Sequence, residues 1–184
     1  EAEVAMDEAG RFTALRVDLK ANMGAYLHQF APHIPWVGTT MAPGLYDIPT
    51  MHVLIDGVYT NTVPVDAYRG AGRPEAAYVI ERLVDEAARV MGMDPADMRR
   101  LNFIKPEQLP YTTAADRTYD TGEFEGHMNR ALEVIDHAGF PAREAESKAR
   151  GKVRGIGVSS YIEACAFPGA ENAEVILGED GTVT

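Results

Sequence analysis

The sequence VPVDAYRGAGRPE, residues 63–75, marks the point at which a strand-like pattern gives way to a helical one. Gly70 and Gly72 can adopt backbone conformations that are closed to other residues, and they leave room for a ligand to approach. The stretch comes just before a predicted helix N-terminus, where free N–H groups and the helix dipole favour anions. Arg69 and Arg73 add two positive charges. The residues alone fit a ligand-binding loop and a structural glycine turn with paired arginines equally well.

The sequence before this stretch predicts β structure. Residues 13–21 alternate apolar and charged side chains, which is typical of a half-buried strand. A loop rich in proline and glycine is expected over residues 24–49. The dipeptide Asp56-Gly57 lies between two strand-like runs, residues 51–55 and 58–63, and predicts a β-hairpin.

The sequence after the stretch predicts helices and then a return to strands. Apolar residues at helical spacing indicate a helix over residues 75–91, which carries Ile80, Leu83, Val84, Ala87 and Met91 on one face and ends at Gly92. Asp94-Pro95 predicts the start of a helix over 95–101, with Asp94 as its N-cap. A third helix is expected over 122–138 and is closed by Gly139 and Pro141, and a short charged helix is expected over 142–149.

Two further β segments are expected near the end of the chain. Residues 153–164 predict a strand in which Gly155 and Gly157 let another backbone approach closely. Residues 173–177 and 182–184 predict a hairpin around a turn at 178–181. The fold class is therefore α+β, with residues 1–66, 67–150 and 151–184 as successive parts. Because strand-like residues reach both ends, we expect an internal fragment of a longer protein.

Composition excludes several classes of protein. A formal net charge of −11 and a pI near 4.8 argue against nucleic-acid binding. The single cysteine, Cys165, cannot build a disulfide framework or an iron–sulfur cluster, and no apolar run has the length of a membrane span. The five histidines lack the spacing of metal ligands, so no metal site made of protein ligands is expected.

The stretch AYRGAGR, residues 67–73, resembles the active-site loop of molybdenum hydroxylase large subunits. These subunits belong to the xanthine dehydrogenase, aldehyde oxidase and aerobic carbon monoxide dehydrogenase family. The variant is most similar to that of carbon monoxide dehydrogenase-like large subunits of the second form. The resemblance extends over most of the chain, through residues 59–62, 94–104, 110–112, 119–122, 155–157 and 161–163.

The resemblance implies a redox enzyme assembled from several subunits. The complete large subunit would be several times longer than this chain, and its two elongated α+β domains would hold molybdenum in molybdopterin cytosine dinucleotide. Residues 1–66 would be the β-rich end of the first of these domains, 67–150 the active-site loop with a helical segment, and 151–184 the beginning of the next β-rich part. A medium subunit would carry FAD, a small subunit would carry 2Fe-2S clusters, and the cytoplasmic enzyme would be a dimer of such heterotrimers.

The resemblance also implies roles for residues of the loop. The family hydroxylates small molecules with oxygen from water, and Arg69 would be the catalytic residue that positions substrate and stabilises negative charge on oxygen. Gly70, Ala71 and Gly72 would lie at the cofactor near the molybdenum. The catalytic base, a glutamate, would lie beyond residue 184, so the isolated chain is expected to be inactive and free of cofactor.

The position after Arg69 departs from part of the family. Enzymes that oxidise carbon monoxide carry a copper-binding cysteine there, whereas this chain has Gly70. Because copper(I) requires a soft thiolate, an aldehyde, a purine or another N-heteroaromatic compound is at least as good a substrate candidate as carbon monoxide. The alternative is a non-catalytic scaffold or interaction domain derived from the same family.

Overall fold

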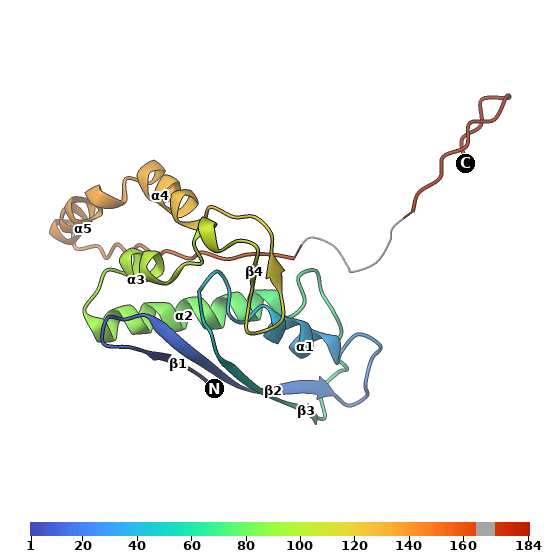
Figure 1. Cartoon of the computed structure of the whole chain (residues 1–184), viewed down its shortest axis with the longest axis horizontal. Coiled ribbons are helices and arrows are strands. Elements are labelled where there is room, and N and C mark those ends of the chain that lie inside the picture. The colour runs from blue at the N-terminus through green and yellow to red at the C-terminus, as the bar shows by residue number, and fades with distance from the viewer. Residues whose placement is uncertain (165–171) are drawn as a thin grey trace.

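The computed structural model describes residues 1–164 and 172–184. Its main body is a three-stranded sheet covered by helices (Figure 1). Strand β1 (Ala2–Met6) pairs antiparallel with the long strand β2 (Phe12–Gly24). Strand β3 (Met51–Tyr59) pairs parallel with β2, so the sheet is mixed and has the order β1-β2-β3. The α+β class predicted from the sequence is confirmed.

The predicted Asp56-Gly57 hairpin is wrong. Both residues lie inside the continuous strand β3, where Asp56 pairs with Lys20 and Gly57 with Ala21 of the central strand. The Lys20 ammonium also donates a hydrogen bond of 3.0 Å to the Asp56 carboxylate. Pairing along the whole length of β2 therefore overrides the local preference of an Asp-Gly dipeptide for a turn.

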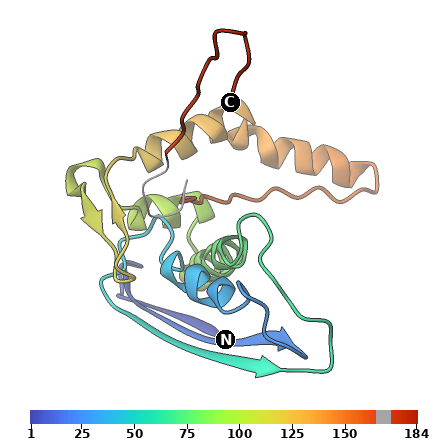
Figure 2. The same ribbon diagram turned by 90° about the vertical axis from the view of Figure 1, so that its right-hand side faces the viewer.

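The connection between β2 and β3 contains a helix that the sequence pattern did not predict. Helix α1 (His33–Thr40) includes Pro35 and Gly38, which lower its intrinsic helix propensity. Pro35 lies within the first turn, where the missing N–H has no helical partner to lose. The helix packs beside α2 on the same side of the sheet (Figure 2).

Helix α2 (Arg73–Met91) forms the centre of the molecule and confirms the helix predicted over residues 75–91. Its buried residues include Ile80, Val84 and Ala87, which belong to the same core cluster as Phe12 and Leu15 of β2. Gly92 ends the helix in the left-handed conformation with φ +64°, and the Met93 N–H donates back to Ala88 O at 2.9 Å. The same core includes residues from the β2–β3 connection and from α3, namely Leu45, Tyr46, Ile48, Met98 and Phe103.

Helix α3 (Pro95–Asn102) confirms the second predicted helix and its cap. The Asp94 carboxylate accepts hydrogen bonds from the N–H groups of Ala96 at 2.7 Å and Asp97 at 3.3 Å. The 3-10 turn η1 (Pro106–Gln108) and the short strands β4 (Tyr111–Thr112) and β5 (Thr118–Tyr119) follow. Residues 103–121 had no predicted element, because two-residue strands carry no periodic signal.

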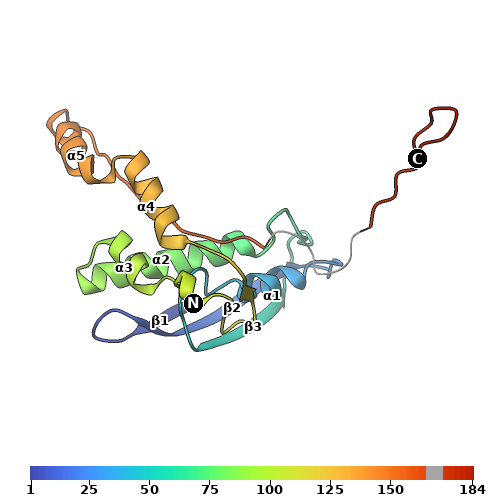
Figure 3. The same ribbon diagram turned by 45° about the horizontal axis from the view of Figure 1, so that its top comes forward.

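The helix predicted over residues 122–138 is shorter in the structure. Helix α4 (Phe124–Val134) ends before Asp136, which adopts the left-handed conformation with φ +50°. The 3-10 turn η2 (His137–Gly139) then leads into α5 (Phe140–Ala149), the predicted short helix. Pro141 lies in the first turn of α5 and starts that helix rather than closing the previous one. Figure 3 shows α4 and α5 projecting from the body formed by α2 and the sheet.

The strand predicted over residues 153–164 is not formed in the described part of the chain. Residues 151–164, called the strap below, run in extended form between the α2–α3 layer and the α4–α5 layer (Figure 1). Val158, Ser160 and Ile162 are partly buried, whereas Ser159 and Tyr161 between them are exposed, so a strand-like alternation is present without a paired strand. The predicted close approach of another backbone to Gly155 and Gly157 is also wrong, because a Cβ at either position would meet nothing within 4 Å.

The predicted C-terminal hairpin is confirmed. Ile176 and Thr184 exchange two backbone hydrogen bonds, of 2.8 and 2.9 Å, and Leu177 pairs antiparallel with Val183. The turn between them is held by a hydrogen bond of 2.9 Å from the Gly181 N–H to Gly178 O. Cys165 lies outside the described residues.

Candidate functional site

Residues 60–72, called the loop below, connect the end of β3 to the start of α2 and contain most of the predicted ligand-binding stretch, residues 63–75. Its first half is held against the end of β2, because the Ala25 N–H donates to Thr62 O and the Thr60 N–H donates to Gly24 O, each at 3.0 Å. A Cβ on Gly24, which has φ +73°, would lie 2.4 Å from Val63 O. This glycine lets the loop cross the strand end closely, and the sequence analysis did not assign it a role.

Gly70 and Gly72 both adopt the left-handed backbone conformation, with φ +94° and +84°. At Gly72 the space is also restricted, since a Cβ there would lie 2.0 Å from Ile34 O. Gly38 of α1 faces the same contact, and a Cβ on Gly38 would lie 2.6 Å from Gly72 O. The loop therefore requires glycine at both Gly72 and Gly38, and the start of α2 is fixed against α1.

Arg69 is exposed and lies beside Tyr68, which is 88% exposed. Within residues 1–164 and 172–184, the Arg69 guanidinium has neither a hydrogen-bond acceptor nor a carboxylate partner. Its backbone, by contrast, belongs to a tight turn, in which the Ala71 N–H donates to Tyr68 O at 2.8 Å. The loop thus presents an unpaired planar cation on a fixed backbone.

The Arg73 guanidinium, in contrast to that of Arg69, makes hydrogen bonds and an ion pair. Its Nε donates to Gly70 O at 3.0 Å, and its Nη1 donates to Ala164 O at 2.9 Å. The same Nη1 lies 2.7 Å from Glu163 Oε1. For Arg73, these contacts agree with the structural alternative of a glycine turn with paired arginines.

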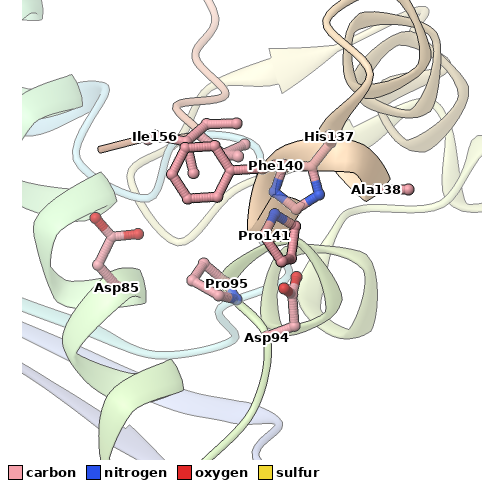
Figure 4. A pocket seen from close by; sticks show the side chains of 10 residues that line it. Asp85, Asp94, Pro95, His137, Ala138, Phe140, Pro141 and Ile156 are labelled. Atoms are coloured by element: carbon pink, nitrogen blue, oxygen red, sulfur yellow. The ribbon is translucent and has the colours of Figure 1, made fainter. Parts of the chain in front are cut away.

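Among the cavities of the described residues, two bear on the choice of site. A cavity of about 400 Å³ lies behind the loop, between β2, α1 and the start of α2, and it is lined mainly by apolar side chains such as Leu19, Ile34 and Val79. A larger cavity of about 590 Å³ opens between α3, α5 and the strap (Figure 4). Its carboxylates already have structural roles, because Asp85 pairs with Arg99 at 3.0 Å and Asp94 caps α3. The larger cavity is therefore not the predicted site.

The described residues contain no group of three or more His, Cys, Asp or Glu side chains that could hold a metal ion. His28, which precedes α1, pairs with Asp66 of the loop through Nδ1. None of the helices in the described part of the chain is long and apolar enough to cross a membrane.

A buried ionic cluster beneath the strap was not predicted. Arg99 of α3 is fully buried, and its Nε and Nη2 donate to Glu81 Oε2 at 3.0 and 2.8 Å. Glu81 is 5% exposed, and its other oxygen accepts from the Tyr46 hydroxyl. Burial, followed by the Glu81 charge, raises the pKa of Tyr46 well above its ordinary range. The sequence did carry a signal, because Glu81 shares a helical face with Val84 and Ala88, three and seven residues on.

Comparison with known proteins places this chain in a family. Residues 1–103 match the family model of the molybdopterin cofactor-binding domain. The chain is similar to the carbon monoxide dehydrogenase large chain of Hydrogenophaga pseudoflava, with 36% identity over 89% of this chain and 21% of that protein. It is also 29% identical to the 6-hydroxypseudooxynicotine dehydrogenase complex subunit gamma of Paenarthrobacter nicotinovorans, over 99% of this chain and 24% of that protein.

The fold agrees with these sequence matches. The crystal structure of quinoline 2-oxidoreductase from Pseudomonas putida 86 superposes with a TM-score of 0.74 and 32% identity, over 82% of this chain and 19% of that chain. The chain thus spans about a fifth of the length of the relatives that it matches. The family match over residues 1–103, the relatives and the shared fold agree with the resemblance carried by residues 67–73, and the chain belongs to the molybdopterin cofactor-binding domain family of molybdenum hydroxylase large subunits.

Proposed function

We propose that the chain supplies the substrate-facing loop of a molybdopterin-dependent oxidoreductase, with Arg69 as its catalytic residue. The observation that carries the proposal is the exposed Arg69 guanidinium, which has no partner among the described residues although its backbone lies in a rigid glycine turn. An arginine that only stabilised the fold would be paired, as Arg73 is. A fixed, always-charged fork is suited to negative charge that develops on a substrate oxygen.

The residues of the loop fit an anionic cofactor. The left-handed glycines Gly70 and Gly72 leave the backbone without side chains at the point where it turns into α2. That helix has 19 residues, so its N-terminus carries the positive end of a long dipole, although the Arg73 N–H already donates to Gly70 O at 3.0 Å. Gly70, Ala71 and Gly72 would hold the molybdopterin cofactor, as its cytosine dinucleotide, near its metal. When bound, that cofactor supplies the two-electron oxidation of a carbon centre with oxygen from water.

We assign the substrate to small electrophilic carbon compounds, namely aldehydes, purines and other N-heteroaromatic compounds, in preference to carbon monoxide. One relative is named for an N-heteroaromatic compound, quinoline, and another for carbon monoxide. Gly70 has φ +94°, and a Cβ there would lie 3.2 Å from Pro74 Cγ. The chain has no cysteine at this position, and a cysteine placed there would have a strained backbone. Both points favour the carbon-hydroxylating members of the family as the model for this chain.

We infer partners and compartment from the family. A medium subunit would bind FAD and a small subunit would bind 2Fe-2S clusters, in a cytoplasmic dimer of heterotrimers. This division of labour suits a chain that has a single cysteine. The alternative, a non-catalytic scaffold domain, accounts for the buried core but not for an exposed, unpaired Arg69 on a glycine turn.

The test is turnover of the complete, molybdenum-loaded enzyme in ¹⁸O-labelled water. Quinoline, an aromatic aldehyde and carbon monoxide are offered separately, and molybdenum and copper are measured on the same preparation. We expect labelled oxygen in the product of at least one carbon substrate, no copper and no oxidation of carbon monoxide. Copper-dependent oxidation of carbon monoxide would overturn the substrate assignment. A complete subunit that binds no molybdenum would favour the scaffold alternative.

A further inference from the structure

The strap has the pattern of a strand but is held in place by side chains. Its inward residues Val158, Ser160 and Ile162 alternate with exposed residues, and it pairs with no strand in the described part of the chain. Its first residues are tied to α5, where the Lys152 N–H donates to Ser147 O at 2.9 Å. Further along, its backbone is held from α2, by Glu81 at Ser160 and by Arg73 at Ala164. The later part of the strap, residues 158–164, therefore depends on α2 for its position.

The first of these contacts comes from the buried ionic cluster. Glu81 Oε2 accepts from the Ser160 N–H at 2.7 Å, in addition to its two hydrogen bonds from Arg99. With the Tyr46 hydroxyl on Oε1, the carboxylate is fully satisfied. A charged, buried acceptor with fixed donors gives a strong and well-oriented hydrogen bond. Glu81 thus fixes the middle of the strap to the core.

The second contact joins the end of the strap to the Arg69 loop. The Arg73 guanidinium is mostly buried, with 18% of the side chain exposed, and it lies between Gly70 O on one side and Glu163 with Ala164 O on the other. Gly70 directly follows Arg69, so a group that holds Gly70 O also limits the movement of the Arg69 backbone. Lysine could not replace Arg73, because a single ammonium lacks the planar fork that reaches acceptors on opposite sides.

We propose that Arg73 is a positioning residue, which locks the Arg69 loop to the strap through Glu163, while Glu81 anchors the strap to the core. This inference rests on the proposed function in one respect, namely that the locked loop carries the catalytic Arg69. The coupling itself is a property of this chain and is measured without any cofactor. The order of the Arg69 loop then depends on the Glu81 carboxylate, which lies beneath the strap and acts through Glu163 and Arg73.

The coupling is tested by amide hydrogen exchange of the 184-residue chain, read at Ser160 of the strap and Ala71 of the loop. We expect Arg73→Lys and Glu163→Gln each to speed exchange at Ala71 on the order of tenfold. Glu81→Gln should speed exchange at both Ser160 and Ala71. Arg82→Lys and Glu86→Gln are matched controls, because both residues lie on the exposed side of α2 and, among the described residues, their ion pairs are with neighbours on that helix.

Glu81→Gln leaves Arg99 buried beside a neutral partner and can prevent folding. For that case Ser160→Pro removes only the N–H that Glu81 accepts and leaves the cluster intact. The proposal is overturned if Glu81→Gln or Ser160→Pro speeds amide exchange in residues 158–162 while exchange at Ala71 keeps its original rate. It is equally overturned if Arg73→Lys leaves Ala71 unchanged.

Kinetics of the molybdenum-loaded enzyme separate this inference from the proposed function. If Arg69 is catalytic, Arg73→Lys should lower kcat about tenfold with little change in KM, because the loop is loosened and no substrate contact is removed. Faster exchange at Ala71 with an unchanged kcat would support the coupling and overturn the catalytic role of Arg69. An unchanged exchange rate with a lowered kcat would overturn the coupling and leave the proposed function standing.

Discussion

Arg69 and Arg73 are four positions apart, but only Arg73 is paired among the described residues, and substitution of Arg69 should cost the larger share of activity. In the complete enzyme, Arg69→Ala should lower kcat on the order of 100-fold or more, since a donor that meets charge in the transition state is lost. Arg69→Lys should also lose activity, because it keeps the charge but not the fork. Steady-state turnover with molybdenum content measured on each variant checks this. Near-normal kcat in loaded Arg69→Ala would make the loop a structural turn.

Arg99 and Arg82 offer a second comparison, which concerns stability. Both pair with Asp85, but Arg99 is fully buried and Arg82 is exposed. Arg99→Met should destabilise the chain by about 3–5 kcal/mol, because it leaves Glu81 buried without its cationic partner. Arg82→Met should cost about 0.5 kcal/mol or less. Urea unfolding of both variants decides the matter, and equal losses would show that burial of the cluster is unimportant.

At the scale of the elements, Gly57 and Gly72 distinguish a strand from a turn. Gly57 lies within β3, and a Cβ there would lie at an ordinary 3.5 Å from Met23 Cγ. Gly57→Ala should therefore stabilise the chain by about 0.5–1 kcal/mol, since glycine is unfavourable in a strand interior. A hairpin turn at this position would give the opposite sign.

Gly72→Ala is the contrasting variant. The left-handed φ of +84° and a Cβ only 2.0 Å from Ile34 O should together destabilise the chain by more than about 2 kcal/mol. Thermal unfolding of Gly57→Ala and Gly72→Ala in the same buffer compares the two. A Gly72→Ala variant as stable as the parent chain would contradict the close packing of α1 against the start of α2.

The elements that could be predicted are those whose signals are local. Helix α2 followed from an apolar spacing repeated over about three turns, from Ile80 to Met91, and α3 followed from the Asp94-Pro95 cap, because both signals act within a few residues. The Asp56-Gly57 turn and the strand at 153–164 failed for one shared reason. Whether an extended segment pairs depends on a partner distant in sequence, which was β2 for residues 51–59 and is absent among the described residues for the strap.

The residues of the candidate site also fall into those that the sequence indicated and those that only the structure revealed. The glycines and arginines of residues 69–73 were visible in the sequence, because each is unusual for its own residue type. Glu81, Gly38 and Gly24 were not assigned, since their importance lies in contacts made across the fold, to Ser160, Gly72 and Val63 respectively. Sequence reasoning located the loop, and only the structure shows what holds it.

At the scale of the whole molecule, the segments packed around α2 are held by the buried hydroxyls of Tyr46 and Tyr119 as well as by apolar contacts. Tyr46 stacks on Phe103 with ring centroids 5.6 Å apart, and its hydroxyl donates to Glu81. The Tyr119 hydroxyl donates to Gly44 O at 2.9 Å and connects the β4–β5 hairpin to the β2–β3 connection. Both phenols must stay protonated to make these contacts, so the whole assembly should be sensitive to alkaline pH.

Burial raises the pKa of Tyr119 to about 12, whereas an unfolded tyrosine titrates near 10. Between these values the folded chain keeps a proton that the unfolded chain has released, so the free energy of unfolding falls as pH rises from about 10 to 12. Tyr119→Phe should lose about 1 kcal/mol at neutral pH with the hydrogen bond to Gly44, but its stability should fall less steeply above pH 10. Tyr68→Phe, at an exposed phenol, should keep the parent slope. Urea unfolding from pH 8 to 12 measures the three slopes, and an unchanged slope in Tyr119→Phe would show that this phenol does not couple folding to pH.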